Sequence, residues 1–195
     1  MDRTAQSIQR LYHIYQSVFV MNNGAPNYPQ MTTVYIALGS NLGDPRTNLE
    51  RAVAEIGALE GVRAMRVSPF YRTKAVGMEE NTPDFLNGVL EAETEWEPRQ
   101  LLDALLRIEK QMGRLRPAGG CASRIIDLDL LLYGNDSRQE TSLELPHPRM
   151  RERWFALKPL ADLAPDLLLP GGETVREALA RVEEEDLGLC GSCGE

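Results

Sequence analysis

Two carboxylates separated by one residue are the clearest chemical signal in the sequence. Asp127 and Asp129 lie in an otherwise aliphatic stretch from Ile125 to Leu132. On a β-strand, residues 126, 128, 130 and 132 would face a core, and both aspartates would face away with Cα atoms roughly 6.6 Å apart. Mg²⁺ would relieve their repulsion and could hold a triphosphate. The alternative is that they only solvate the outer face of a half-buried sheet.

Arginines surround the loop that precedes this stretch. Arg114, Arg116 and Arg124 bracket Gly119-Gly120. A guanidinium offers a planar fork of donors that matches phosphate oxygens. Residues 107–158 contain ten basic and seven acidic side chains, although the net charge of the chain is −8. This local excess favours a small polyanion such as a nucleoside triphosphate, and the alternative is a solvated basic loop.

Two further segments have the composition of a ligand site. Phe85 and Asn87 would share one face of a strand and together suit a flat, hydrogen-bonding heterocycle. The alternative is a core phenylalanine beside a capping asparagine. Farther along, His147 is followed by three arginines, including Arg153, and by Phe155. This segment could bind a nucleotide base and phosphate, or it could be a helix start with a structural histidine.

The elements that would position these residues follow from the apolar periodicity. Strands are predicted at residues 32–38, 62–68, 85–94 and 125–133. Helices are predicted from Asp44-Pro45, at residues 98–112 and from the capping box Thr174-x-x-Glu177. Residues 39–43 read as a turn, and 74–83 and 117–123 read as loops. This order predicts an α+β fold, a ferredoxin-like α/β sandwich whose mostly antiparallel sheet has helices on one face and is open on the other.

The bulk properties predict one catalytic domain. In a chain of 195 residues, we expect an extension at 1–31 that is flexible or a short helix, a domain at 32–185, and a flexible tail at 186–195 that holds Cys190 and Cys193. No apolar run reaches about 18 residues, and the acidic balance disfavours nucleic acid and anionic membranes. The three cysteines form no disulfide framework. We therefore predict a cytoplasmic monomer that acts on small molecules.

Taken in order, these segments resemble the 6-hydroxymethyl-7,8-dihydropterin pyrophosphokinase family from about residue 32 to residue 182. The segments that carry the resemblance are 37–43 (ALGSNLG), 70–73 (FYRT), 83–87 (PDFLN), Glu109, 113–114 (GR), 124–129 (RIIDLD), 145–147 (LPH), 159–160 (PL) and 164–165 (AP). The resemblance implies that the domain transfers the diphosphate group of ATP to 6-hydroxymethyl-7,8-dihydropterin in folate biosynthesis, with AMP as the second product.

The resemblance also implies roles for individual residues. Asp127 and Asp129 would bind two Mg²⁺ ions that bridge the ATP phosphates, and with Arg114 and Arg124 they would form the catalytic set. ATP would be bound by Glu109, Arg114, Arg116, Arg124, His147 and Arg153. The pterin would be bound by Thr73, Val76, Phe85, Asn87 and Phe155, with the two phenylalanines on opposite sides of its ring.

The sequence departs from the family pattern in one loop. Residues 120–123 (GCAS) lack a basic residue and an aromatic that the family usually has, and Lys74 stands where proline is common. We expect weaker loop closure and a lower nucleotide affinity or rate. The reaction would be an in-line attack of the pterin hydroxyl on the β-phosphorus. Either aspartate could accept the hydroxyl proton, and the sequence assigns neither.

Two other functions are compatible with parts of this pattern. A metal-dependent nucleotidyl- or glycosyltransferase could use the same pair of aspartates, but it would not require a pterin. A ferredoxin-like RNA-binding module would need a basic sheet face with exposed aromatics. The net charge of −8 and the paired aspartates disfavour the RNA-binding module, and the residues Phe85, Asn87 and Phe155 disfavour the other transferases.

Overall fold

An antiparallel sheet formed by the four segments with alternating apolar residues is the centre of the fold. The computed structural model describes residues 30–75, 81–114 and 123–190, with side chains described as far as residue 183. The long strands are β1 (Thr32–Ser40), β2 (Val62–Val67), β4 (Phe85–Thr94) and β5 (Asp127–Tyr133). Each matches a predicted strand, although β1 extends through Gly39 and Ser40, which we expected in a turn.

The topology is the ferredoxin-like one that the order of elements predicts. The strands are hydrogen-bonded in the order β2-β4-β1-β5, and every pair is antiparallel. A short strand that we did not predict, β3 (Tyr71–Thr73), extends the sheet by pairing with β4. Helix α2 (Pro45–Gly57) connects β1 to β2, and α3 (Pro98–Gln111) connects β4 to β5. The α+β class is therefore confirmed.

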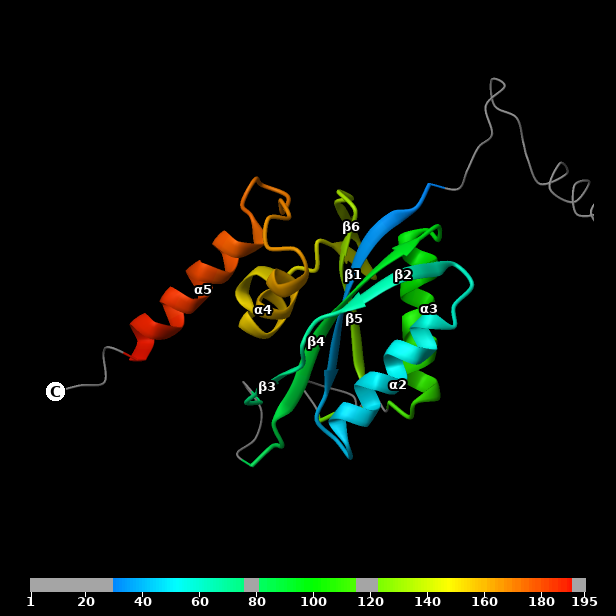
Figure 1. The fold of residues 1–195 in the computed structure, drawn as a ribbon, viewed down its shortest axis with the longest axis horizontal. Helices are drawn as coiled ribbons and strands as arrows, with labels where there is room; N and C mark the ends of the chain where they lie inside the picture. The colour runs from blue at the N-terminus through cyan, green and yellow to red at the C-terminus, as the bar shows by residue number, and fades with distance from the viewer. Residues whose placement is uncertain (1–29, 76–80, 115–122, 191–195) are drawn as a thin grey trace, which may run out of the picture. The chain divides into compact units, whose positions relative to one another are not determined.

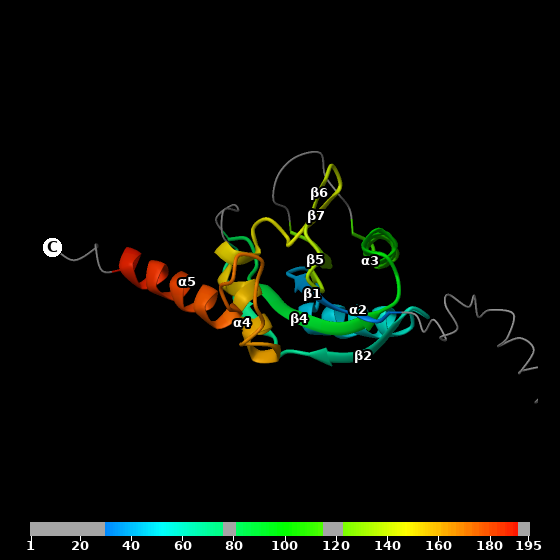
Figure 2. The same ribbon diagram turned by 90° about the horizontal axis from the view of Figure 1, so that it is seen from above.

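The helices α2 and α3 cover one face of the sheet (Figures 1 and 2). The predicted cap of α2 is present, because the Asp44 carboxylate accepts hydrogen bonds from the backbone N–H groups of Arg46 and Thr47 at 3.1 and 3.3 Å. The apolar stripes of both helices pack on the sheet to form the first core. Its helical members include Leu49, Ala52, Ile56, Leu101, Leu105 and Ile108.

A β-bulge interrupts the alternation that we predicted for β5. Ile36 pairs with Leu130, and its neighbour Tyr35 pairs with Leu132, so Leu131 is an extra residue on β5. An extra residue in one strand moves the following side chains to the opposite face. Leu130 consequently packs in the first core, whereas Leu131 and Leu132 pack in a second core. The prediction that Leu132 faces the same core as Leu128 is therefore wrong.

The second core lies on the other face of the sheet, which we expected to be open. The helix α4 (Trp154–Leu163) packs against β4, and α5 (Val175–Cys190) packs against α4 (Figure 1). Tyr35 and Val89 of the sheet pack with the buried residues of these helices. The expectation that helices lie on one face only is thus corrected, because both faces carry an apolar core.

The C-terminal part of the fold confirms one prediction and extends another. Thr174 and Glu177 form the predicted capping box, in which the backbone N–H of each residue donates to the side chain of the other at 2.8 and 3.2 Å. Helix α5 continues to Cys190, past the point where we expected the tail to begin. Residues 1–29 of the expected extension and Cys193 of the tail lie outside the described residues.

Short elements connect β5 to α4. The strands β6 (Arg138–Glu140) and β7 (Leu143–Leu145) form a hairpin, and the 3-10 helix η1 (Met150–Glu152) follows it. None of the helices in the described part of the chain is both long and apolar enough to cross a membrane. The chain divides into a unit of residues 1–30 and a unit of residues 31–195, and every element described above belongs to the second unit.

Candidate active site

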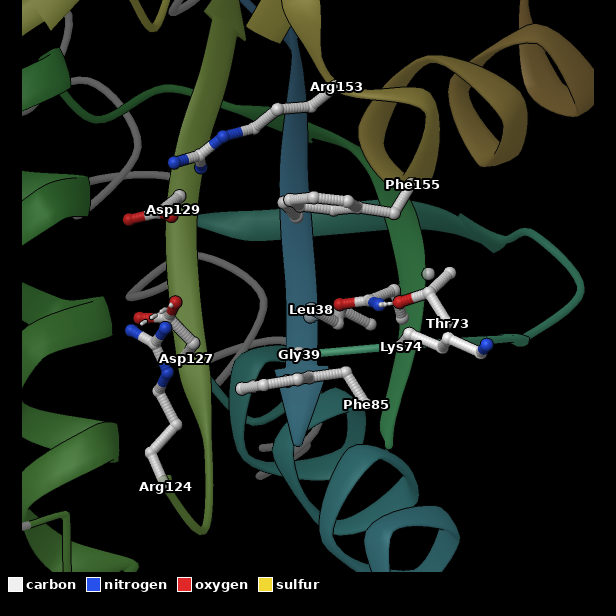
Figure 3. Close-up of a pocket in the computed structure, with 13 residues that line it drawn as sticks. Leu38, Gly39, Thr73, Lys74, Phe85, Arg124, Asp127, Asp129, Arg153 and Phe155 are labelled. Carbon is white, nitrogen blue, oxygen red and sulfur yellow. Dashed lines mark hydrogen bonds and ion pairs between the residues drawn. The ribbon is translucent and has the colours of Figure 1, made fainter. Parts of the chain in front are cut away.

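A pocket lies over the middle strands of the sheet and gathers most of the predicted site residues (Figure 3). They come from β3, β4, β5 and the start of α4, which are far apart in the sequence. The predicted residues that line the pocket are Thr73, Phe85, Asn87, Arg124, Asp127, Asp129, Arg153 and Phe155. The fold therefore brings together residues from the four segments whose composition suggested a ligand site.

The floor of the pocket is formed by small residues of β1. Gly39 pairs with Asn87 on one side and with Asp127 on the other, so one row across the sheet joins the amide to the carboxylate. A Cβ atom at position 39 would lie 3.1 Å from the Asn87 Oδ1 atom. The absence of a side chain at position 39 thus leaves open the space between the apolar and the charged sides of the pocket.

The charged side is built around Asp127. Its Oδ1 atom lies 2.5 Å from the Arg114 Nη1 atom, and its Oδ2 atom lies 2.9 Å from the Arg124 Nη1 atom. The Arg124 Nε atom is buried and has no hydrogen-bond partner among the described residues. A buried donor without a partner is costly, so an incoming anionic oxygen would be bound favourably here.

Asp129, two residues farther along β5, has a different environment. Burial raises the pKa of its carboxyl group above the ordinary value, and the negative charge of Asp127 raises this pKa further. Figure 3 shows the Arg153 guanidinium pointing towards Asp129 from the start of α4. The charged form of Asp129 is thus destabilised by its surroundings, and a nearby cation would stabilise it.

The pair of aspartates fits a magnesium ion that is shared with phosphates. In the described part of the chain, no three His, Cys, Asp or Glu side chains cluster into a metal site. Mg²⁺ does not need such a cage, because it commonly uses one or two carboxylates and completes its octahedron with water and substrate phosphates. Asp127 and Asp129 provide those carboxylates, and a bound cation would offset the burial that raises the pKa of Asp129.

The apolar side of the pocket can hold a flat ring. The Phe85 and Phe155 side chains reach over the pocket at two different levels, with Leu38 and Thr73 between these levels (Figure 3). The Asn87 Nδ2 atom donates a hydrogen bond to the Thr73 Oγ1 atom at 2.8 Å. This bond fixes the orientation of the Asn87 amide, whose oxygen then faces the floor at Gly39.

Cations lie over both phenylalanine rings. The Arg124 Cζ atom lies 5.5 Å from the centroid of the Phe85 ring, and the Arg153 Cζ atom lies 5.4 Å from that of Phe155. Attraction between a guanidinium and an aromatic face steadies both groups. The apolar and charged sides of the pocket are therefore in direct contact, which suits a ligand that has a ring at one end and phosphates at the other.

Glu109 lies behind this pocket and does not line it. Its side chain is 2 % exposed, its Oε1 atom accepts a hydrogen bond from the backbone N–H of Leu128 at 2.8 Å, and it forms an ion pair with Arg114. We predicted that Glu109 binds the nucleotide. In the structure it contacts Arg114 and the β5 backbone, so it holds Arg114 close to Asp127.

His147 also lies outside the set of lining residues, although its charge interacts with that of Asp129. Burial lowers the pKa of the His147 imidazole, and the negative charge of Asp129 partly opposes this effect. The His147 Nδ1 atom accepts a hydrogen bond from the backbone N–H of Arg149 at 3.3 Å. The neutral ring therefore carries its proton on Nε2.

Several predicted or altered positions cannot be compared with the structure. Val76, Arg116 and residues 120–122 of the atypical loop lie outside the described residues. Conversely, the structure adds Gly39 and Lys74 to the pocket and places Asn41 beside it. Gly39 and Asn41 are hard to select as site residues from residue type alone, because glycine and asparagine are common in turns for reasons unrelated to ligands.

Comparisons with known proteins agree on one family. Residues 35–165 match 7,8-dihydro-6-hydroxymethylpterin-pyrophosphokinase (HPPK). The chain is 40% identical over 157 residues to the 2-amino-4-hydroxy-6-hydroxymethyldihydropteridine pyrophosphokinase of Haemophilus influenzae, covering 80% of this chain and 97% of that protein. It is 44% identical over 147 residues to the enzyme of the same name from Pseudomonas aeruginosa, covering 75% and 90% of the two chains.

Solved structures support the fold. The wild-type HPPK-DHPS of Plasmodium falciparum with pteroate aligns with a TM-score of 0.63 and 14% sequence identity. The alignment covers 83% of this chain and 47% of that chain, so the present chain spans less than half of the larger protein. At this level of identity the comparison bears on the fold alone, and it agrees with the ferredoxin-like topology described above.

Proposed function

The chain belongs to the 7,8-dihydro-6-hydroxymethylpterin-pyrophosphokinase family, and from this premise we propose how its pocket performs the reaction of that family. The protein is a diphosphotransferase. It transfers the diphosphate group of ATP to 6-hydroxymethyl-7,8-dihydropterin, a step of folate biosynthesis. The residues that do this are assigned below from the geometry of the pocket.

The pterin binds on the apolar side of the pocket. Phe85 and Phe155 lie on opposite faces of its ring, where they provide a flat apolar surface. Asn87, which Thr73 holds by the 2.8 Å hydrogen bond, offers an amide group to the hydrogen-bonding edge of the heterocycle. Val76 belongs to the same proposed set on the strength of the sequence resemblance alone. The hydroxymethyl group then points along the floor at Gly39 towards the aspartates.

The triphosphate of ATP binds on the charged side. Arg124, whose buried Nε atom needs an acceptor, and Arg114, which Glu109 holds in place, provide donors for the phosphate oxygens. Arg153 adds positive charge from α4, and we assign supporting contacts to Arg116 and His147. Asp127 and Asp129 would hold two magnesium ions between them and the phosphates, and these ions would draw negative charge from the phosphates.

The proposed reaction is a single in-line displacement. The pterin hydroxymethyl oxygen gives up its proton to one of the two aspartates or to water and forms a bond to the β-phosphorus of ATP. The bond between this phosphorus and the oxygen that bridges to the α-phosphate breaks, and AMP leaves with that oxygen. Positioning and electrostatic stabilisation carry most of the catalysis of such reactions. Here Phe85 lies on β4 and the two aspartates lie on β5, the two strands that flank β1, so both substrates are aligned by one sheet.

The observation that carries this proposal is the contact between the two sides of the pocket. Arg124 pairs with Asp127 and also lies over the Phe85 ring, so a phosphate site and an aromatic site share one residue. A nucleotidyl- or glycosyltransferase would need the aspartates but has no use for the space between Phe85 and Phe155. Transfer of diphosphate from ATP to a flat pterin needs both the aspartates and the space between the two phenylalanines.

Product analysis tests this function directly. The protein is incubated with Mg-ATP in the presence and absence of 6-hydroxymethyl-7,8-dihydropterin, and the nucleotides are separated. We expect AMP to appear only when the pterin is present, in an amount equal to the dihydropterin diphosphate. Formation of ADP, or of AMP without the pterin, would contradict the proposed reaction.

We also propose that the protein acts in the cytoplasm as a monomer and binds neither nucleic acid nor membranes. The support is the net charge of −8 together with substrates that are small molecules. Size-exclusion chromatography with light scattering would check the monomer, and a mass of twice that of the chain would contradict it.

A further inference from the structure

Asn41 connects two segments that border the pocket, although it does not line the pocket itself. It follows the last residue of β1 and is 3 % exposed. Its Nδ2 atom donates hydrogen bonds to the Pro83 carbonyl oxygen at 3.1 Å and to the Ser123 Oγ atom at 3.0 Å. Its Oδ1 atom accepts a hydrogen bond from the backbone N–H of Arg124 at 2.7 Å. Its own backbone N–H donates to the Arg124 carbonyl oxygen at 3.1 Å.

The two segments carry residues from opposite sides of the pocket. Pro83 precedes Phe85, the aromatic residue of β4, by two positions. Ser123 precedes Arg124, which pairs with Asp127 and lies over the Phe85 ring. Pro83 and Ser123 are 42 and 82 residues from Asn41 along the chain. One amide side chain therefore joins the entry to β4 with the entry to β5.

Only a side chain with both donors and an acceptor makes these bonds. The Asn41 amide uses two N–H donors and one oxygen acceptor, which is close to its full capacity. Alanine would leave the partly buried backbone N–H of Arg124 and the carbonyl oxygen of Pro83 without these partners. Aspartate would keep the acceptor but would turn a carboxylate oxygen towards the Pro83 carbonyl oxygen. The local chemistry thus requires asparagine at a buried position.

We propose that Asn41 is a positioning residue that aligns the phosphate-binding side of the pocket with the ring-binding side. It binds both the backbone N–H and the carbonyl oxygen of Arg124, so the guanidinium is directed at Asp127 and at the incoming phosphates. The bond to Pro83 fixes the start of β4, so Phe85 stays at a constant distance from Arg124. The kinetic part of this inference rests on the function proposed above.

Kinetics of Asn41→Ala provide the first test, with Asn48→Ala as the matched control. The Asn48 amide donates hydrogen bonds to Ser40 and Leu42 in the connection between β1 and α2, which also contains Asn41. It has no such bond to the described residues of the segments that precede β4 and β5. For Asn41→Ala we expect kcat to fall about 10- to 100-fold, because small displacements of a catalytic group have effects of this size. We expect the KM for the pterin to rise as well, and Asn48→Ala to stay near wild type in both constants.

A milder variant protects this test against a folding defect. Ser123→Ala removes one hydrogen bond of the Asn41 amide and leaves no backbone group without a partner. We expect a fall in kcat in the same direction, of about two- to fivefold, with an unchanged melting temperature. The inference is wrong if Asn41→Ala and Ser123→Ala both keep kcat and KM within about twofold of wild type per folded molecule.

Hydrogen exchange provides a readout that does not depend on activity. Exchange is followed by mass spectrometry in peptides that cover residues 81–86 and 123–128. In Asn41→Ala we expect faster exchange in both peptides and unchanged exchange in β1 and α3, whereas a general loss of stability would accelerate exchange everywhere. Unchanged exchange in the two peptides would refute the link. If wild type failed to form AMP from the pterin, the proposed function would be wrong, and the exchange data would still decide the role of Asn41.

Discussion

Asp127 and Asp129 are two residues apart on one strand, yet their surroundings differ. Asp127 forms ion pairs with Arg114 and Arg124, so its charge is compensated within the protein. Burial and the charge of Asp127 both raise the pKa of Asp129. The protein therefore holds a carboxylate in a state that favours a proton or a cation. Such a position lowers stability in return for function.

The replacement Asp129→Asn separates the contribution of this carboxylate to catalysis from its cost in stability. We expect kcat to fall about 100-fold or more, because a metal-binding carboxylate that contributes several kcal/mol is lost. We expect the melting temperature of the metal-free protein at pH 7 to rise by a few degrees. The sign follows from the raised pKa: the folded state disfavours the charged form, so wild type carries a cost above the ordinary pKa of about 3.8 that the amide does not. Thermal unfolding from pH 3 to pH 8 measures it.

The pH dependence and a control complete this experiment. The stabilisation should shrink as the pH falls and should nearly vanish by about pH 3, where the Asp129 carboxyl group of wild type is largely neutral in both the folded and the unfolded state. Asp103→Asn removes an exposed carboxylate that pairs with Arg99 on α3, and we expect it to change neither kcat nor stability. A wild-type rate in Asp129→Asn would contradict the assignment of this residue to the metal.

The strand β3 and the helix α4 are joined beside the pocket by a small polar cluster. The Tyr71 hydroxyl donates a hydrogen bond to the Asp162 Oδ2 atom at 2.5 Å, and the Lys158 Nζ atom lies 5.2 Å from the centre of the Tyr71 ring. The same two elements carry Thr73 and Phe155 into the pocket. The cluster therefore fixes the position of Phe155 relative to Thr73 on the ring-binding side of the pocket.

The replacement Tyr71→Phe tests this coupling between elements. It removes the hydroxyl and keeps the edge-on contact with Trp154. We expect the KM for the pterin to rise about two- to fivefold and the free energy of unfolding to fall by about 1 kcal/mol or less. Tyr133→Phe is the matched control, because its hydroxyl donates to the Trp96 carbonyl oxygen at 2.7 Å, away from the pocket. A similar rise of KM in both variants would contradict the coupling.

The long elements were predictable because their side chains follow one period without interruption. The strand at Phe85–Thr94, the start of α2 and the helix α3 agree with the predicted segments within a residue or two. The bulge in β5 was not predictable, because Leu130, Leu131 and Leu132 are all aliphatic and fit either face. The same ambiguity hid the second core, since a strand that is apolar on both faces has no alternation to read.

The candidate site was predictable where a residue type is unusual for its element. Asp127 and Asp129 stand out in an aliphatic strand, and Phe85 and Asn87 share a face by alternation. Gly39 and Asn41 do not stand out, because their roles depend on pairing between strands that are distant in sequence. Glu109 was predicted to bind ATP, and only the packing of α3 on β5 shows that it contacts Arg114 and the backbone of Leu128.

The distribution of charge over the chain agrees with a phosphate-binding site near Asp127 and Asp129. The net charge is −8, yet Arg114, Arg124 and Arg153 gather near Asp127 and Asp129. A local positive field of this kind attracts a triphosphate, and the acidic balance of the whole chain is the basis of our proposal that it does not bind nucleic acid. The alternative of an RNA-binding module is weakened further because α4 covers part of the sheet face that such a module would need.

All described parts of the site come from the unit of residues 31–195. The match to the family starts at residue 35, and the first core residue of the sheet is Val34. We therefore expect a chain that starts at Met31 to keep kcat and both KM values within about twofold of the full chain and to melt within about 2 °C of it. Steady-state kinetics and thermal unfolding of the two chains measure this.

We expect a C-terminal truncation, in contrast to removal of residues 1–30, to lower both stability and pterin binding. A chain that stops at Gly172 loses Val175, Ala178 and Val182, which are buried in the second core beside α4. Buried side chains of this size contribute about 1–3 kcal/mol each, so this truncation should lower the melting temperature strongly and should raise the KM for the pterin, because α4 carries Phe155. A loss of activity of more than about tenfold on removal of residues 1–30 would show instead that the first unit takes part in the function.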